Sequence, residues 1–162
     1  MNHVESLIAE WYRYQKYLVC ANVRTRKGKR GGWQRELDVL AYRPKDRLLV
    51  HIEANPSADT WAVRKQRLGK KFDLKHEEYE ELINASIGRI KKIAVIGWSE
   101  KPYGQRLGEE IEIISTKHLL REIARELSKL DFDHSAIPET MPLLRTVQLT
   151  MRLCMAKRTV ND

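Results

Sequence analysis

Two carboxylates and a histidine lie on the polar faces of two neighbouring predicted strands. Asp38 is in the middle of the segment ELDVLAY, whereas His51, Glu53 and Asn55 alternate with apolar residues in the segment LLVHIEAN. Side chains two apart in a strand share a face, so these three polar groups point in one direction. Carboxylates that converge from adjacent strands repel each other and favour a cation between them. A hard divalent ion such as Mg²⁺ suits such oxygen ligands, and it can polarise a phosphate and lower the pKa of bound water.

A simpler interpretation of the same residues stays open. Asp38 and Glu53 can belong to a solvated face of the sheet, where they pair with lysine or arginine side chains. Two acids in two strands are common, so spacing alone does not separate the two interpretations.

The elements that would position these acids follow from the hydrophobic pattern. The early strands are joined by hairpin turns and the later ones through helices, which indicates a mixed sheet in an α/β layer arrangement. In the helix after Pro56, the apolar stripe is expected at Trp61, Leu68 and Phe72, with a bend or break at Gly69. The core face of the Asp38 strand is expected at Leu37, Val39 and Ala41, and Asp38 is expected on the opposite face. The predicted helices are 3–16, one within 57–86, 116–130 and 143–158, and the predicted strands are 17–23, 36–43, 47–55, 89–99 and 109–115.

The stretch GGWQRELDVLAYRPKDRLLVHIEAN combines a strand with a central aspartate, a hairpin, and a hydrophobic strand that ends in Glu-Ala-Asn. This pattern resembles the core of the PD-(D/E)xK nuclease superfamily, over roughly residues 1–75. The preceding helix carries Glu5, with Glu10 as a second candidate, where some branches of the superfamily have an acid. The resemblance implies a restriction-endonuclease-like fold, in which a mixed β-sheet flanked by helices forms three α/β/α layers.

The resemblance also implies a phosphodiesterase that acts on DNA and depends on Mg²⁺ or Mn²⁺. Asp38 and Glu53 would bind the metal, together with the backbone carbonyl of Ala54. The motif lysine is expected two residues after the glutamate, but Asn55 stands there. An amide carries no charge, so its role would be limited to hydrogen bonding or metal ligation.

Two replacements for that lysine are considered. The next helix supplies Lys65 as the predicted substitute, while Arg64 suits a phosphate clamp because its fork binds bidentately, and Lys71 lies near the same edge. The alternative is His51, which can act as a base near neutral pH. The alternative interpretations are that His51 is a structural, hydrogen-bonded histidine and that Lys65 is an ordinary flanking lysine.

A basic loop is predicted over residues 24–35, directly before the Asp38 strand. It carries Trp33 and several cations, of which Arg26, Lys27, Lys29 and Arg30 are the predicted nucleic-acid contacts. The whole chain has 30 Lys and Arg against 22 Asp and Glu, a formal charge of +8, which favours a polyanionic partner. DNA is the preferred partner of the chain. The alternative interpretation of residues 24–35 is a solvated loop that contacts no nucleic acid.

The 162 residues suit a nuclease-like domain over 1–134 and a C-terminal helical extension over 135–162. That extension either completes the core or pairs with a second copy to form a homodimer. Two cysteines in no ligand pattern, an acidic N-terminus and short apolar runs predict a cytoplasmic protein without a membrane partner.

Three functions are therefore compared. The first is a metal-dependent DNA endonuclease. The second is a protein of the same fold that has lost catalysis and binds DNA or a partner protein. The third is a basic RNA-binding protein without a metal site.

Overall fold

The computed structural model describes residues 2–27, 31–55, 60–97, 106–107, 110–131 and 134–156. Its central element is a mixed sheet of six strands in the order β1-β2-β3-β4-β6-β5. β3, β4 and β6 run parallel to one another, whereas β1–β2, β2–β3 and β5–β6 are antiparallel pairs. The strands are β1 (Leu18–Lys27), β2 (Trp33–Arg43), β3 (Leu48–Asn55), β4 (Arg89–Ile96), β5 (Arg106–Leu107) and β6 (Ile111–Ser115).

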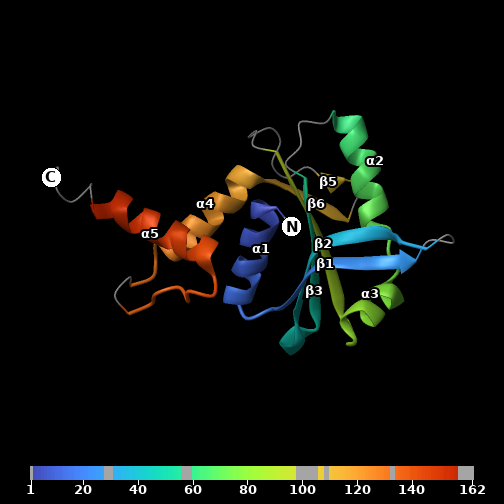
Figure 1. Ribbon diagram of the computed structural model, residues 1–162, viewed down its shortest axis with the longest axis horizontal. Helices are drawn as coiled ribbons and strands as arrows, with labels where there is room; N and C mark the ends of the chain where they lie inside the picture. Colours follow the sequence, from blue (N-terminus) through green and yellow to red (C-terminus); the bar gives the residue numbers. More distant parts are fainter. Residues whose placement is uncertain are drawn as a thin grey trace.

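Helices cover both faces of this sheet, which confirms the predicted α/β class with a mixed sheet flanked by helices. α1, α4 and α5 lie on one side and α2 and α3 on the other, so the arrangement is compatible with three α/β/α layers (Figure 1). The helices are α1 (His3–Tyr14), α2 (Trp61–Phe72), α3 (His76–Ile83), α4 (Thr116–Leu127) and α5 (Pro142–Ala156), with a short 3₁₀ turn over Pro44–Asp46 between β2 and β3.

The largest core lies between the sheet and the layer of α1, α4 and α5. Ile8 from α1 and Ile123 from α4 are among its most deeply buried members. Val50, Ile52 and Ala54 of β3 all join this core, which confirms the face predicted for them. His51 and Glu53 of β3 therefore point to the opposite side, towards α2 and α3.

The first half of α5 contributes to the same core. Leu144 is fully buried and Ile137 in the preceding segment is nearly so. Glu10 of α1 is also buried there, and its Oε2 accepts the backbone N–H of Leu144 at 2.8 Å. A helix N-terminus favours negative charge, so Glu10 holds α5 in place, and its placement does not support an active-site role. Further along α5, Leu149 and Leu153 are exposed; homodimer formation through this helix stays a prediction.

Two smaller clusters fill the other side of the sheet. One gathers around Tyr79 of α3 and includes Leu40 and Leu49, and the other places Leu68 and Phe72 of α2 on β4 and β6. These two helices close over the polar face of β3, so His51 and Glu53 are buried rather than solvated.

The β1–β2 hairpin differs from its predicted form. Much of the expected loop 24–35 is strand, because β1 continues to Lys27 and β2 begins at Trp33. The ladder pairs Ala21 with Val39 and Val23 with Leu37, and it skips the position of Asn22, where φ is 52°. This left-handed residue interrupts the regular pleat.

One face assignment on β2 was consequently wrong. Val39 and Ala41 pack in the large core, as predicted, but Leu37 packs with Tyr79 on the other side of the sheet. The strict alternation therefore does not continue through Asp38, the residue that lies between the two regions.

The helical segment after Pro56 breaks at a different place from the one expected. α2 continues through Gly69 and ends at Phe72, and α3 begins four residues later. A glycine costs a helix interior only about 1 kcal/mol, which the burial of Leu68 and Phe72 offsets. The carboxylate of Glu78 accepts a hydrogen bond from the backbone N–H of Lys75 at the start of α3.

Candidate active site on strands β2 and β3

Asp38 and Glu53 lie side by side on the paired strands β2 and β3, as predicted. The Asp38 backbone N–H donates to Glu53 Oε1 at 3.3 Å, and the Ala54 backbone N–H donates to Asp38 Oδ2 at 2.8 Å. Each carboxylate is thus oriented by the backbone of the other strand, which leaves Asp38 Oδ1 and Glu53 Oε2 for a shared partner.

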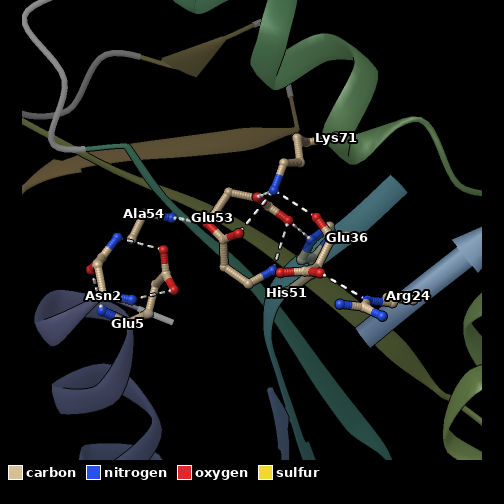
Figure 2. Close-up of polar contacts among 9 residues, drawn as sticks. Asn2, Glu5, Arg24, Glu36, His51, Glu53, Ala54 and Lys71 are labelled. Carbon is tan, nitrogen blue, oxygen red and sulfur yellow. Dashed lines mark hydrogen bonds and ion pairs between the residues drawn. The ribbon is translucent and has the colours of Figure 1, made fainter. Parts of the chain in front are cut away.

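That shared partner is the ammonium group of Lys71, which reaches the strands from α2. Its Nζ lies 2.8 Å from Asp38 Oδ1 and 2.6 Å from Glu53 Oε2, and it also donates to the backbone carbonyl of Glu36 at 2.6 Å (Figure 2). An ammonium has three donors, and these contacts use all of them. Lys65, the substitute chosen from the sequence, lies instead on an exposed part of α2.

The packing of α2 explains why Lys71 rather than Lys65 contacts the two carboxylates. Leu68 and Phe72 are buried, whereas Trp61, expected in the same apolar stripe, is 43 % exposed. Lys71 lies three residues after Leu68 and directly before Phe72, so it borders the buried stripe, and its ammonium contacts Glu36 and Asp38 of β2. Its place beside these two apolar residues was a usable signal, although the expected stripe through Trp61 obscured it.

His51 lies behind Glu53, where both of its ring nitrogens are engaged. Nε2 is 2.8 Å from Glu53 Oε1 and Nδ1 is 2.7 Å from the Tyr79 hydroxyl. Burial, and next the positive charge of Lys71, lower the pKa of His51 to about 3, so the ring is neutral at pH 7. A carboxylate only accepts, so Nε2 carries the proton and Nδ1 accepts from Tyr79.

This placement corrects the hypothesis that His51 acts as the base. The side chain is fully buried, and its hydrogen bonds orient the carboxylate of Glu53 instead. The alternative of a structural, hydrogen-bonded histidine describes the geometry better. The sequence contained no signal for Tyr79, which joins the group through α3, a separate element.

The charges in this group depend on one another. Burial raises the pKa of Asp38, with repulsion by Glu53 as the second cause, and burial raises the pKa of Glu53 against the opposing effect of Lys71. Burial acts to lower the pKa of Lys71, but the two carboxylates outweigh it and raise that pKa above its ordinary value. Lys71 is therefore an ammonium at neutral pH, and the group favours a further positive charge.

The two carboxylates border a cavity of about 230 Å³ that is partly open to solvent. Glu5 lines it from the N-terminus of α1, as the resemblance implied, and both of its oxygens accept hydrogen bonds from Asn2 as part of the helix cap. Figure 2 shows Glu5 and Asn2 facing the strand end at Ala54. The cavity is lined by Glu5, Asp38, Glu53, Ala54, Arg67, Leu68 and Lys71.

The donor set fits a hard divalent ion. Among the described residues, no group of three or more His, Cys, Asp and Glu side chains is placed to hold a metal. Mg²⁺, however, is usually bound through one or two carboxylates, with water and substrate oxygens completing its shell. Asp38 and Glu53 supply such a pair, and Ala54 lines the same cavity.

The residues predicted to contact nucleic acid lie in different environments in the structure. Arg26 is paired with Glu78, with Nε and Oε1 2.8 Å apart, and it also donates to the backbone carbonyl of Asp73, so it joins the hairpin to α3. Arg64 is half-buried on α2, with a guanidinium nitrogen close to Gly97. Other predicted groups lie outside what the structure describes: the side chains of Lys27 and Asn55, and residues Lys29 and Arg30 altogether.

Comparisons with known proteins do not assign this site. Models of known protein families gave no match to the chain, and curated protein sequences gave none either. Within the described residues, none of the helices is long and apolar enough to cross a membrane. The geometry of Asp38, Glu53 and Lys71 is therefore the basis for a functional proposal.

Proposed function

We propose that this protein is a Mg²⁺- or Mn²⁺-dependent DNA endonuclease with a restriction-endonuclease-like fold, in which Lys71 replaces the motif lysine absent at Asn55. The observation that carries the proposal is the contact of one ammonium with a half-buried and a buried carboxylate, 2.8 Å from Asp38 and 2.6 Å from Glu53. The order of elements up to β3 and the open cavity beside the carboxylates support it.

In this proposal Asp38 and Glu53 bind the metal, and the backbone carbonyl of Ala54 assists. When bound, the ion supplies positive charge to a phosphate and a lowered pKa to a water molecule. His51 and Tyr79 hold Glu53 in one orientation, which keeps the site preorganised. Glu5 borders the cavity but is committed to the cap of α1.

Lys71 supplies charge rather than base catalysis. Its raised pKa keeps it protonated at neutral pH, so it does not take a proton from water. Its ammonium can move from the carboxylates to the phosphate and stabilise the negative charge that develops there during cleavage.

A second candidate is a protein of this fold that binds nucleic acid or a protein partner without cleaving a substrate. The observation that favours it is the use of all three Lys71 donors, which already places one positive charge between the carboxylates, where a metal would bind. In such a protein the lysine would be a structural replacement for the metal.

Nicking of supercoiled plasmid DNA in Mg²⁺ or Mn²⁺ tests the first candidate. We expect the wild-type protein to nick, and Asp38→Asn to reduce the rate by roughly 10²-fold or more. Lys71→Ala is expected to reduce it similarly, whereas Lys65→Ala, an exposed lysine on the same helix, serves as the matched control.

Calorimetric titration with Mn²⁺ separates the candidates. An endonuclease should bind the ion in the wild type and lose that binding in Asp38→Asn. Plasmid that stays intact with every divalent ion, together with an absence of Mn²⁺ binding, would refute the endonuclease and leave the second candidate.

A further inference from the structure

Two more hollows continue from the carboxylate cavity across the surface of α2 and β2. The first, about 430 Å³, is here named the basic groove and is lined by Arg35, Glu36, Arg67, Lys70 and Lys71. It shares Arg67 and Lys71 with the cavity, so the two hollows meet at these side chains.

The second hollow lies beyond the basic groove. It is about 300 Å³, is lined by Arg24, Trp33, Arg35 and Glu36, and is here named the Trp33 hollow. It shares Arg35 and Glu36 with the groove, so the three hollows adjoin and together form a path from the carboxylates towards Trp33. Figure 2 shows part of this path, in which Glu36 bridges Lys71 and Arg24.

The path is positively charged beyond the carboxylates. Arg67 and Lys70 are three residues apart on α2 and exposed, so they share one face of the helix. Arg35 faces them from β2, where it donates to the backbone carbonyl of Asp73 at 2.6 Å. Two nearby acids, Glu36 and Asp73, reduce the charge but do not cancel it.

One of the pairs that these acids form can exchange. Arg24 and Glu36 are 3.2 Å apart, and their side chains are 62 % and 48 % exposed. Ion pairs in water are worth little, so phosphate oxygens can compete for Arg24. Arg35 is held more firmly, because its side chain is 15 % exposed and donates to the Asp73 backbone carbonyl.

Trp33 ends the path with a partly exposed side chain. The residue is 51 % exposed and lines the Trp33 hollow together with Arg24 and Arg35. An indole flanked by arginines is a stacking platform for a nucleobase, and stacking on it tolerates any base. A base inside a duplex is already stacked on its neighbours, so only an unpaired base can use this platform.

We infer that single-stranded DNA lies along this path, with phosphates on Arg67 and Lys70 and an unpaired base on Trp33. Trp33 and Asp38 are five residues apart on β2, roughly 17 Å, so the strand would span a few nucleotides. The inference rests on the proposed function only for placing the scissile phosphate at the carboxylates; the binding itself needs no metal.

Fluorescence anisotropy with a labelled oligo-dT of about 12 nucleotides, within the range of single-strand sites, tests this in buffer with EDTA. We expect the single strand to bind more tightly than a blunt hairpin duplex of equal charge. Trp33→Ala should weaken binding roughly 10- to 100-fold, and Trp33→Phe should restore most of it. Trp61→Ala, another exposed tryptophan, is the control.

The charged part of the path is tested by salt. Arg67→Ala and Lys70→Ala should each weaken binding and reduce the slope of log K against log salt by about 0.7, the value per phosphate in single strands. Lys65→Ala carries the same charge change on the same helix and should leave the slope as it is.

The two proposals fail separately. Equal affinities of Trp33→Ala and Trp61→Ala, in variants with wild-type circular dichroism, would overturn the single-strand path, as would tighter binding of the duplex. Single-strand binding that depends on Trp33, without cleavage in any divalent ion, would support the path and overturn only the endonuclease.

Discussion

Replacing Lys71 by methionine tests the electrostatics of the site without any assumption about catalysis. Methionine keeps a flexible chain of similar length on α2 but removes the ammonium that lies between Asp38 and Glu53. Two carboxylates then share a largely buried site without this cation, although each keeps a hydrogen bond from a backbone N–H. We expect a less stable protein whose deficit depends on pH.

The expected loss follows from the burial of the three groups. Breaking a fully buried ion pair by removing one partner costs about 3–5 kcal/mol. Lys71 is 33 % exposed, Asp38 15 % and Glu53 2 %, so solvent screens part of this interaction. We therefore expect a loss of about 2 kcal/mol at pH 8. In a chain of 162 residues that corresponds to a fall in Tm of about 4–8 °C.

The sign of the pH dependence follows from the carboxylates. The pKa of Glu53 is already raised by burial, and the variant loses the opposing effect of Lys71, so the pKa rises further. A raised carboxyl pKa means that the folded state takes up a proton at a pH where the unfolded state does not. The deficit should therefore be largest at pH 8 and shrink as the pH falls towards the raised pKa.

Urea denaturation followed by circular dichroism at pH 8 and pH 5.5 measures the deficit. Lys65→Met is the matched control and should stay within about 0.5 kcal/mol of the wild type. Adding Glu53→Gln to Lys71→Met should recover part of the loss, because one charge of the repelling pair is removed. Equal stability of the Lys71 and Lys65 variants, or a deficit that grows as the pH falls, would refute the reasoning.

Four further substitutions test other parts of the structure, the first three by urea denaturation. Tyr79→Phe removes the hydrogen bond to His51 and should cost about 1–3 kcal/mol, since a buried ring nitrogen is left without its donor; a neutral result would refute that bond. Leu144→Ala should cost about 2–4 kcal/mol and Leu153→Ala, on the exposed part of α5, under about 0.5; equal losses would show that α5 does not complete the core. Arg26→Ala should raise the pKa of Glu78, its partner on α3, from about 2 towards the ordinary value near 4.3, as measured by NMR titration. In the wild type, the stability contributed by the pair is therefore full above that ordinary value and is lost as the pH falls towards 2. An unchanged titration of Glu78 would contradict the ion pair.

Much of the site was accessible from local sequence. The alternation of β3 placed Glu53 opposite the core face of Ile52, because side chains of a strand alternate whatever covers the sheet. The hairpin then brought Asp38 next to Glu53, since antiparallel pairing over a short turn leaves few registers. Glu5 at the third position of α1 also followed from local pattern, and the structure places it at the same cavity.

Other contacts depended on elements that lie far apart in the chain. The sequence does not say how α2 is rotated about its axis, and that rotation decides that Lys71 rather than Lys65 faces the carboxylates. Arg26 was expected to contact nucleic acid because it belongs to a basic stretch, yet the packing of the hairpin on α3 brings it to Glu78. In both cases the deciding force is burial of apolar residues on another element, which has no local signature.

The sequence by itself determined the central strands, the face on which Asp38 and Glu53 lie, and the excess of positive charge, because these depend on local periodicity and composition. It missed the short strand β5 and the extension of β1 and β2 into the predicted loop. The tertiary structure decided which cation joins the two acids, because α2 docks through Leu68 and Phe72 and so presents Lys71. It likewise decided that His51 orients Glu53, since α3 buries the ring and places the Tyr79 hydroxyl against its second nitrogen.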